Sequence, residues 1–209
     1  MSKKNYKIIH REALFQGFCR VDRYHIRQEL YQGGWSDVFS REVFSGAEQA
    51  AVVLLFDPHQ DKVILIEEFR SAPMIHDEDP FLLECVAGMI NGGETAEQAA
   101  RREALEEAGC NVAELQKIFA YYPSPGFLAE QVTLFIGRTQ APEDGSIHGL
   151  EHEGENIKVV VLDAMQAINR LYTGKYRDAA TIIAMQWFAL RHTDLRSRWL
   201  VSETSGALI

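Results

Sequence analysis

The stretch Gly88–Cys110 reads GMINGGETAEQAARREALEEAGC, and the rest of the chain is interpreted outward from it. Its centre has the pattern of a helix, because alanines recur every four residues and Gly109 follows where a helix usually ends. Thr95 and Gln98 have the spacing of a capping box, in which each residue binds the other's backbone N–H group. We therefore predict a helix over Thr95–Ala108.

The predicted helix carries two glutamates, Glu103 and Glu107, that lie four residues apart and therefore on one face. Like charges at this spacing destabilise an isolated helix, and a hard divalent cation between them would reverse the sign of the interaction. Arg102 and Glu106 are also four apart, so we predict an ion pair that leaves the first two glutamates for metal. A solvated acidic face is the ordinary alternative for a glutamate-rich helix.

The spacing of the whole segment goes beyond an acidic helix. Seven positions resemble the Nudix box, G-x5-E-x7-R-E-U-x-E-E-x-G-U, where U is a bulky aliphatic residue: Gly88, Glu94, Arg102, Glu103, Glu106, Glu107 and Gly109. At about 7% usage for each residue type, a chance match has a probability of roughly 10⁻⁸ per starting position. Ala104 and Cys110 are smaller than the family's aliphatic residues, and neither position is a ligand in the family.

The resemblance implies an α/β protein, a Nudix α/β/α sandwich with a mixed sheet, that hydrolyses a pyrophosphate linked to another group. It implies bound Mg²⁺, with Mn²⁺ as an alternative. Water attack on an anionic pyrophosphate needs charge neutralisation and an activated water, and divalent cations supply both. The metal ligands implied are the Ala87 carbonyl and the side chains of Glu103, Glu106, Glu107 and Glu155, with Glu106 either a ligand or a support. Glu94 would brace the motif.

Two features outside the box resemble the bacterial ADP-ribose pyrophosphatase subgroup. Ser124-Pro125-Gly126 begins a loop with its proline fifteen residues past the box, although the same tripeptide is also an ordinary turn. An acidic loop follows His148-Gly149-Leu150, and the resemblance makes Glu153 the catalytic base and Glu155 a metal contact. A shift of two residues would exchange those roles, and a plain surface loop is the alternative.

The subgroup implies hydrolysis of ADP-ribose to AMP and ribose 5-phosphate, with another nucleoside diphosphate sugar such as GDP-mannose or ADP-glucose as the alternative substrate. Residues 1–47 would form an antiparallel β region for dimerisation and adenine binding, and residues 48–209 the catalytic domain. Glu103 and Glu107 would act in catalysis with Glu153. The substrate contacts implied are Phe18, Arg41, Glu42, Arg70, Met89, Ser124, Gly126 and Glu130.

Composition bears on nucleic-acid binding, on membrane insertion and on the role of the cysteines. The 209 residues carry a formal charge of −9, so we expect no general attraction to nucleic acid. We expect no signal peptide and no membrane span, because the longest apolar run, Ala50–Phe56, is far too short. Cys19, Cys85 and Cys110 lack metal-site spacing and are interpreted as small apolar residues. A cytoplasmic location is the expectation.

Patterning predicts the other elements. The first 45 residues are expected to be extended, with Gly33-Gly34 turning one stretch into the next. We expect strands at Ala50–Phe56, Lys62–Glu68, Phe81–Val86, Ile118–Tyr122, Val132–Gly137 and Lys158–Leu162, a helix capped by Asp163 with Gln166 that runs to Leu171, a third helix over Asp178–His192, and a loose tail at Ser202–Ile209.

Overall fold

The computed structural model describes residues 4–46 and 49–206 of the chain. The chain divides into two compact units, one made of residues 1–49 with 121–131, and the other of residues 50–120 with 132–209. The domain boundary proposed from the sequence, between positions 47 and 48, lies outside the described residues. Each unit is described by itself.

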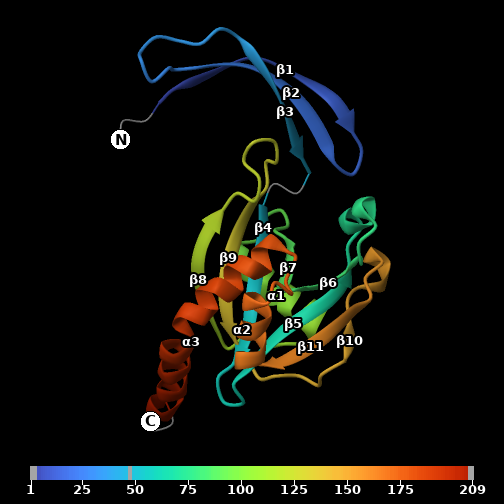
Figure 1. Cartoon of the computed structure of the whole chain (residues 1–209), viewed down its shortest axis with the longest axis vertical. Coiled ribbons are helices and arrows are strands. Elements are labelled where there is room, and N and C mark those ends of the chain that lie inside the picture. The colour runs from blue at the N-terminus through green and yellow to red at the C-terminus, as the bar shows by residue number, and fades with distance from the viewer. Residues whose placement is uncertain (1–3, 47–48, 207–209) are drawn as a thin grey trace. The chain divides into compact units, whose positions relative to one another are not determined.

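The first unit is a three-stranded antiparallel sheet, in the order β1 (Tyr6–Gln16), β2 (Arg20–Gln28) and β3 (Phe39–Ser45) (Figure 1). The predicted glycine turn lies between β2 and β3, where Gly33 and Gly34 have positive φ values of 91° and 79°. A glycine has no Cβ and adopts this region at little cost, which explains the residue choice. The 121–131 segment joins the sheet through backbone hydrogen bonds to Phe44.

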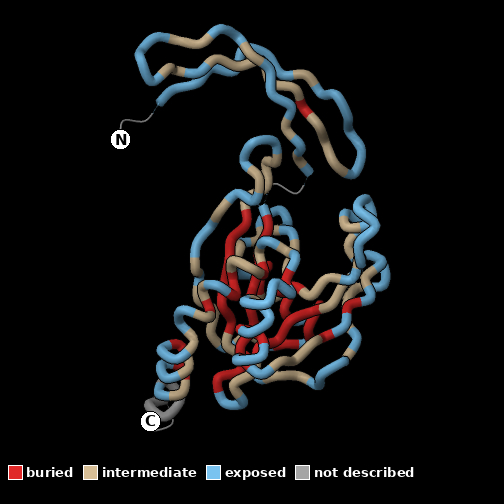
Figure 2. The backbone as a smooth tube through the Cα atoms, viewed as in Figure 1, coloured by how far each residue is buried: buried red, intermediate tan, exposed pale blue. Residues whose placement is uncertain are grey.

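This sheet buries very little of itself. Among the described residues of the first unit, Asp22 alone is buried, held by Arg11 and Arg20 at 2.7 Å each (Figure 2). Its large apolar side chains are mostly exposed, among them Tyr6, Ile8, Leu14, Phe15 and Phe18. A two-layer structure is normally needed to bury such side chains, so this sheet has no core of its own.

The second unit contains an eight-stranded mixed sheet with the order β10-β11-β5-β4-β9-β8, to which β6 adds beside β5 and β7 beside β4. Its strands are β4 (Gln49–Asp57), β5 (Lys62–Phe69), β6 (Phe81–Glu84), β7 (Val86–Met89), β8 (Glu114–Tyr121), β9 (Gln131–Arg138), β10 (Ile147–His148) and β11 (Ile157–Asp163).

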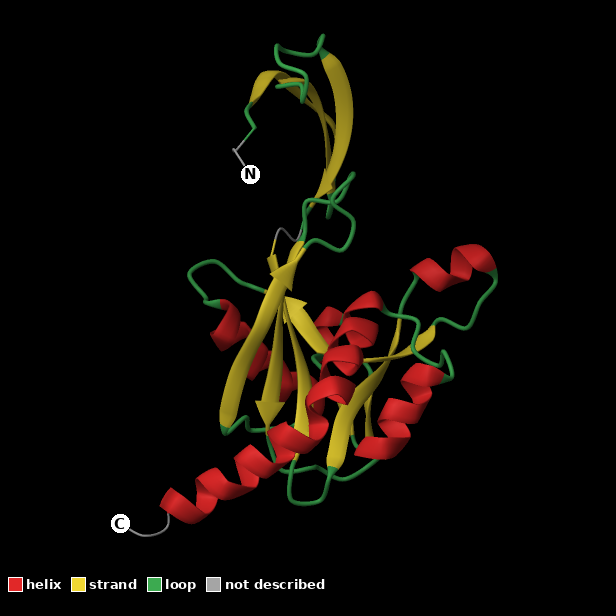
Figure 3. Cartoon of the chain, turned by 60° about the vertical axis from the view of Figure 1, so that its left-hand side comes forward, coloured by secondary structure: helices red, strands yellow, loops and turns green. Residues whose placement is uncertain are grey.

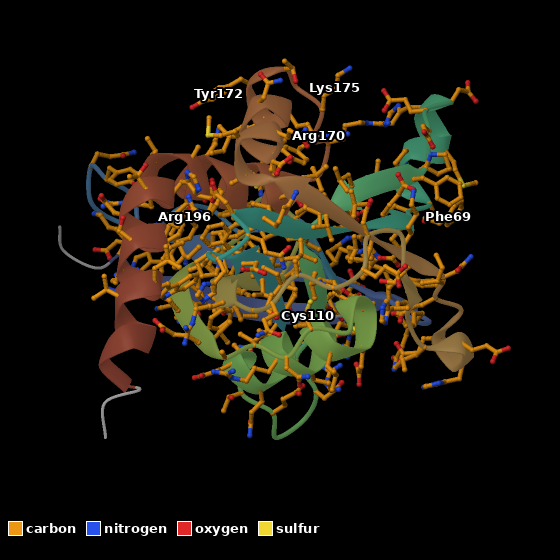
Figure 4. All side chains as sticks on the ribbon, turned by 90° about the horizontal axis from the view of Figure 1, so that it is seen from below. Phe69, Cys110, Arg170, Tyr172, Lys175 and Arg196 are labelled. Atoms are coloured by element: carbon orange, nitrogen blue, oxygen red, sulfur yellow. The ribbon has the colours of Figure 1, made fainter. Side chains whose placement is uncertain are left out.

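Helices cover both faces of this sheet. Helix α1 (Ala96–Ala108) lies on one face, and α2 (Ala164–Tyr172) and α3 (Ala179–Gly206) lie on the other (Figure 3). Figure 4 shows the layers end-on, with Cys110, just past α1, on one side of the sheet and Arg170 and Tyr172 of α2 on the other. The predicted α/β/α sandwich is therefore confirmed. Short 3₁₀ turns, η1 (Ala72–His76) and η2 (Glu151–Glu153), lie in two of the loops.

The hydrophobic core lies on both faces of the eight-stranded sheet, and side-chain size sets how the helices pack on each face. Ile64 and Ile66 of β5 pack with Ala100 and Ala104 of α1, and alanine lets the helix approach the sheet closely. On the other face, Phe56 of β4 contacts three aromatic rings of α3, with centroid distances of 5.0 Å to Phe188, 5.8 Å to His192 and 6.1 Å to Trp199.

Three sequence expectations were wrong in detail. The strand expected over Phe81–Val86 is interrupted at Cys85, whose N–H donates to the Thr181 hydroxyl at 2.8 Å. Asp163 precedes α2 without capping it, because its carboxylate pairs instead with Lys62 Nζ at 2.8 Å. The third helix continues to Gly206, so most of the expected tail is helical, and positions 207–209 lie outside the described residues.

All three cysteines are free thiols. Cys85 and Cys110 are buried among apolar residues and Cys19 is half-buried, as expected for small apolar side chains. Within the described residues, no helix combines the length and the hydropathy needed to cross a bilayer.

Candidate active site

Helix α1 presents its glutamates to the sheet. The predicted capping box is present: the Thr95 hydroxyl accepts the Gln98 N–H at 3.2 Å, and the Gln98 side chain accepts the Thr95 N–H at 2.8 Å. Gly109 ends the helix in the left-handed region, with φ 63°. The alanine face of the helix packs on the sheet core, and Glu103 and Glu107 turn inward beside it, with exposed fractions of 9% and 3%.

Strand β7 lies directly beside these two carboxylates. The Ala87 N–H donates to Glu107 Oε2 at 3.1 Å. A Cβ placed on Gly88 would lie 1.8 Å from Glu103 Oε1, well inside any permitted contact. Position 88 must therefore be glycine for the Glu103 carboxylate to lie against the backbone of β7.

Arg102 connects more acidic groups than we predicted from the sequence. Its guanidinium makes the expected pair with Glu106 at 2.9 Å and also contacts Glu94 at 3.0 Å. It further lies 2.6 Å from Glu103 Oε1, so the expectation that Glu103 would be free of Arg102 was wrong. Glu94 also accepts the Asn91 N–H, which braces the loop before the helix as the resemblance implied.

Burial makes the glutamate pair costly to ionise. Burial raises the pKa of Glu107 to about 9, opposed by the Ala87 N–H and reinforced by the charges of Glu103, Glu68 and Glu155. Burial likewise raises the pKa of Glu103, against the effect of Arg102. Such a pair of inward carboxylates is stabilised by positive charge arriving between them.

The acidic loop after β10 brings one glutamate toward the pair. The Gly149 N–H donates to the Glu106 carbonyl at 3.1 Å, which ties the loop to α1. Glu155 accepts the Leu150 N–H at 2.9 Å, and its charge raises the pKa of both Glu103 and Glu107. Glu153 is more than half exposed, with a contact to His152 at 3.7 Å.

Arg70 follows β5 and lies between two carboxylates. It contacts Glu84 of β6 at 2.9 Å and Glu68 of β5 at 2.8 Å. Neither glutamate was singled out from the sequence. The period-two alternation of the strand was the available signal for Glu68, because it puts residues 68 and 70 on one face.

A comparison with known protein families matches residues 47–184 to the NUDIX domain model. The chain belongs to the Nudix family. Among curated relatives, the ADP-ribose pyrophosphatase of Escherichia coli (strain K12) is 42% identical over 197 residues, which cover 94% of each chain. The GDP-mannose pyrophosphatase of Salmonella typhimurium is 33% identical over 153 residues, covering 73% of this chain and 78% of that one. A crystal structure of an ADP compounds hydrolase superposes with a TM-score of 0.64 at 18% identity, covering 91% and 98%, and supports the fold alone.

The Nudix helix and its surroundings offer a set of donors that fits a divalent cation. The side chains are carboxylates, the hard oxygen ligands that Mg²⁺ prefers, and the pKa values of Glu103 and Glu107 are raised first by burial and then by neighbouring carboxylates. In the described part of the chain, no three Asp, Glu, His or Cys side chains are already grouped as ligands. Arg102 holds Glu103 Oε1, and a cation would have to compete with this contact.

The predicted substrate residues of this Nudix protein fall into both units. Arg70 and Met89 belong to the second unit, and the Met89 carbonyl accepts a hydrogen bond from Arg102 at 3.0 Å. The other six belong to the first unit: Phe18, Arg41, Glu42, Ser124, Gly126 and Glu130.

Within the first unit, the predicted contacts differ in how firmly they are held. Phe18 is 93% exposed. Glu42 pairs with Arg23 at 2.8 Å, and Arg41 stacks on the Phe39 ring at 4.7 Å. The Ser124 carbonyl accepts the Leu128 N–H, which closes the turn that contains Gly126.

Proposed function

We propose that this chain hydrolyses the pyrophosphate of ADP-ribose with Mg²⁺, giving AMP and ribose 5-phosphate. The observation that carries the proposal is the buried pair Glu103 and Glu107, turned toward β7 with Glu155 facing it. Support for the substrate comes from the 42% identity, along 94% of both chains, with an enzyme named for ADP-ribose.

The chain's own residues have distinct proposed roles. Glu103, Glu107, Glu155 and the Ala87 carbonyl would hold the metal ion, which neutralises the pyrophosphate and activates water when bound. Glu106 supports them through Arg102 and through its carbonyl bond to the acidic loop.

Two residues would act on the reactants. Arg70 contacts a phosphate group, and its guanidinium fork suits phosphate oxygens. Glu153 takes the proton of the attacking water as the P–O–P bond breaks. Because Glu153 is more than half exposed, its loop must move for it to reach the water.

The first unit supports a role in adenine binding and dimerisation. Phe18 offers an aromatic ring to a base, and we propose Arg41, Glu42, Ser124, Gly126 and Glu130 as polar contacts to the substrate. Met89, in the second unit, is a separate proposed substrate contact. Exposed apolar side chains across the sheet support burial against a second copy. The formal charge of −9 argues against nucleic acid as a partner. Three free thiols fit a reducing compartment, and we propose the cytoplasm.

A second substrate, GDP-mannose, is favoured by one observation, the relative named for it at 33% identity. That match covers 73% of the chain, against 94% for the ADP-ribose enzyme. Another ADP-sugar such as ADP-glucose shares the adenine and pyrophosphate of ADP-ribose and belongs in the same test. We therefore expect ADP-ribose to be the better substrate.

A panel of nucleoside diphosphate sugars with Mg²⁺ tests the proposal. We expect the highest kcat/KM with ADP-ribose, and AMP with ribose 5-phosphate as the products in ³¹P NMR. Glu107→Gln should lower kcat at least about a hundredfold, because it removes an anionic ligand. Glu97→Gln, the same change on the exposed face of α1, should leave it unchanged. A tenfold preference for GDP-mannose would make the substrate assignment wrong.

A further inference from the structure

Glu68 lies on the active-site face of β5. Ile64 and Ile66 pack against α1, and alternation along the strand places Glu68 on the same face. Its side chain is 13% exposed, compared with 40% for its neighbour Glu67, which faces away and pairs with Lys158 at 3.3 Å. Glu68 is therefore a carboxylate built into the site, and Glu67 provides a matched carboxylate outside it.

Glu68 and Glu84 together surround the Arg70 guanidinium. Arg70 Nε donates to Glu84 Oε2 at 3.0 Å, and Nη2 lies 2.9 Å from the same oxygen. Nη1 donates to Glu68 Oε1 at 3.2 Å, and Nη2 lies 2.8 Å from Glu68 Oε2. All three nitrogens thus lie beside a carboxylate oxygen.

The two carboxylates hold different edges of the guanidinium. Glu84 takes the inner edge, made by Nε and Nη2, and is itself buried. Glu68 takes the outer edge, made by Nη1 and Nη2, which is an edge that phosphate oxygens bind in pairs. Each edge has one hydrogen bond and one ion pair, and the hydrogen bond to Glu68 is the longer, at 3.2 Å against 3.0 Å for Glu84. The Glu68 side chain is also the more exposed of the two, at 13% against 9%.

We propose that Glu68 is a positioning residue that occupies the outer edge of Arg70 until a substrate phosphate displaces it. This inference rests on the proposed function, in which Arg70 contacts a phosphate. Glu68 and Glu84 hold the Arg70 guanidinium in place, within reach of the charge of Glu107. Substrate affinity is lower as a result, because the phosphate must displace the Glu68 carboxylate from Arg70.

Equilibrium binding without divalent metal tests this role in the full-length protein. With ADP-ribose in EDTA, calorimetry should give a Kd about fivefold lower for Glu68→Gln than for wild type. This is the order of one typical net hydrogen bond, because the phosphate no longer competes with the Glu68 carboxylate. Inorganic pyrophosphate, as a second probe, should show the same direction. Glu67→Gln should match wild type. With Mg²⁺, Glu68→Gln should lower KM without raising kcat.

A double-mutant comparison separates competition for Arg70 from simple relief of charge repulsion. In an Arg70→Met background, which keeps the apolar stem, Glu68→Gln should no longer change Kd. Equal tightening in both backgrounds would overturn the proposal, as would unchanged or weaker binding in Glu68→Gln itself. Should Arg70→Met fail to fold in a thermal melt, Arg70→Lys serves the same purpose with a reduced effect. If the wild-type protein did not hydrolyse ADP-ribose with Mg²⁺, that result would instead contradict the proposed function.

Discussion

At the scale of single residues, Glu107 links metal binding to pH. Burial raises its pKa from an ordinary 4.5 to about 9, so the metal-free protein keeps this carboxyl protonated at pH 7. The unfolded chain loses that proton near pH 4.5. The stability of the metal-free fold is therefore greatest below that pH and falls as pH rises toward 9. A cation bound to the carboxylate removes this penalty.

We predict that Mg²⁺ binding releases close to one proton at pH 7 and none above about pH 9, because the ligand must be deprotonated. Affinity should rise with pH across the same interval. Calorimetric titrations in buffers of different ionisation enthalpy measure the released proton directly. Glu107→Gln should remove the release, and an equal release from this variant would assign the proton to another group.

Some side-chain contacts in the site could be predicted from the sequence and others could not. That Glu103 and Glu107 lie on one face was predictable from their spacing, because a helix repeats every 3.6 residues. That this face turns toward the sheet is shown by their burial. The contact between Arg102 and Glu103 was not predictable, because adjacent residues on a helix do not normally face each other. It exists because the long Arg102 side chain reaches back to Glu94 and Met89 across the preceding loop.

At the scale of elements, short-range sequence patterns predicted the helix and strand limits that depend on neighbouring residues. The capping residues and terminal glycine of α1 fixed its limits, and the apolar runs of β4 and β5 fixed theirs. The break at Cys85 depends on Thr181, and the lost cap at Asp163 depends on Lys62. Both partners are about a hundred residues away in the sequence, and local sequence patterns do not predict contacts over that separation.

The acidic loop can be tested as an element by changing three glutamates separately. Glu155→Gln should raise the Mg²⁺ concentration for half-maximal activity about tenfold, because the charge of Glu155 acts on both carboxylates of the pair. Glu153→Gln should lower kcat by about two orders of magnitude at unchanged Mg²⁺ dependence, as expected for a general base. Glu151→Gln is the matched control and should resemble wild type. An exchange of the two effects would show that the roles of Glu153 and Glu155 are reversed.

At the scale of the whole molecule, the first unit needs a partner surface. Its described residues include one buried side chain, and a sheet of this kind gains stability by covering its apolar residues. We predict that light scattering after gel filtration gives twice the chain mass of 23.7 kDa.

Two substitutions in the first unit test that prediction. Ile8→Glu with Phe15→Glu should weaken the dimer at least about a hundredfold, since burial of each large apolar side chain contributes about 1.5–3 kcal/mol. Met165→Glu, at an exposed apolar position on α2, should leave the mass unchanged. A wild-type protein that runs as a single chain at micromolar concentration would contradict the dimer.

The close contact between Gly88 and Glu103 also bears on how this chain can vary. The carboxylate occupies the space where every other amino acid would carry its first side-chain carbon. Even a methyl group at this position would displace the Glu103 carboxylate from its place against the backbone. Gly88→Ala adds a single carbon atom, and we expect it to move the Glu103 carboxylate away from β7.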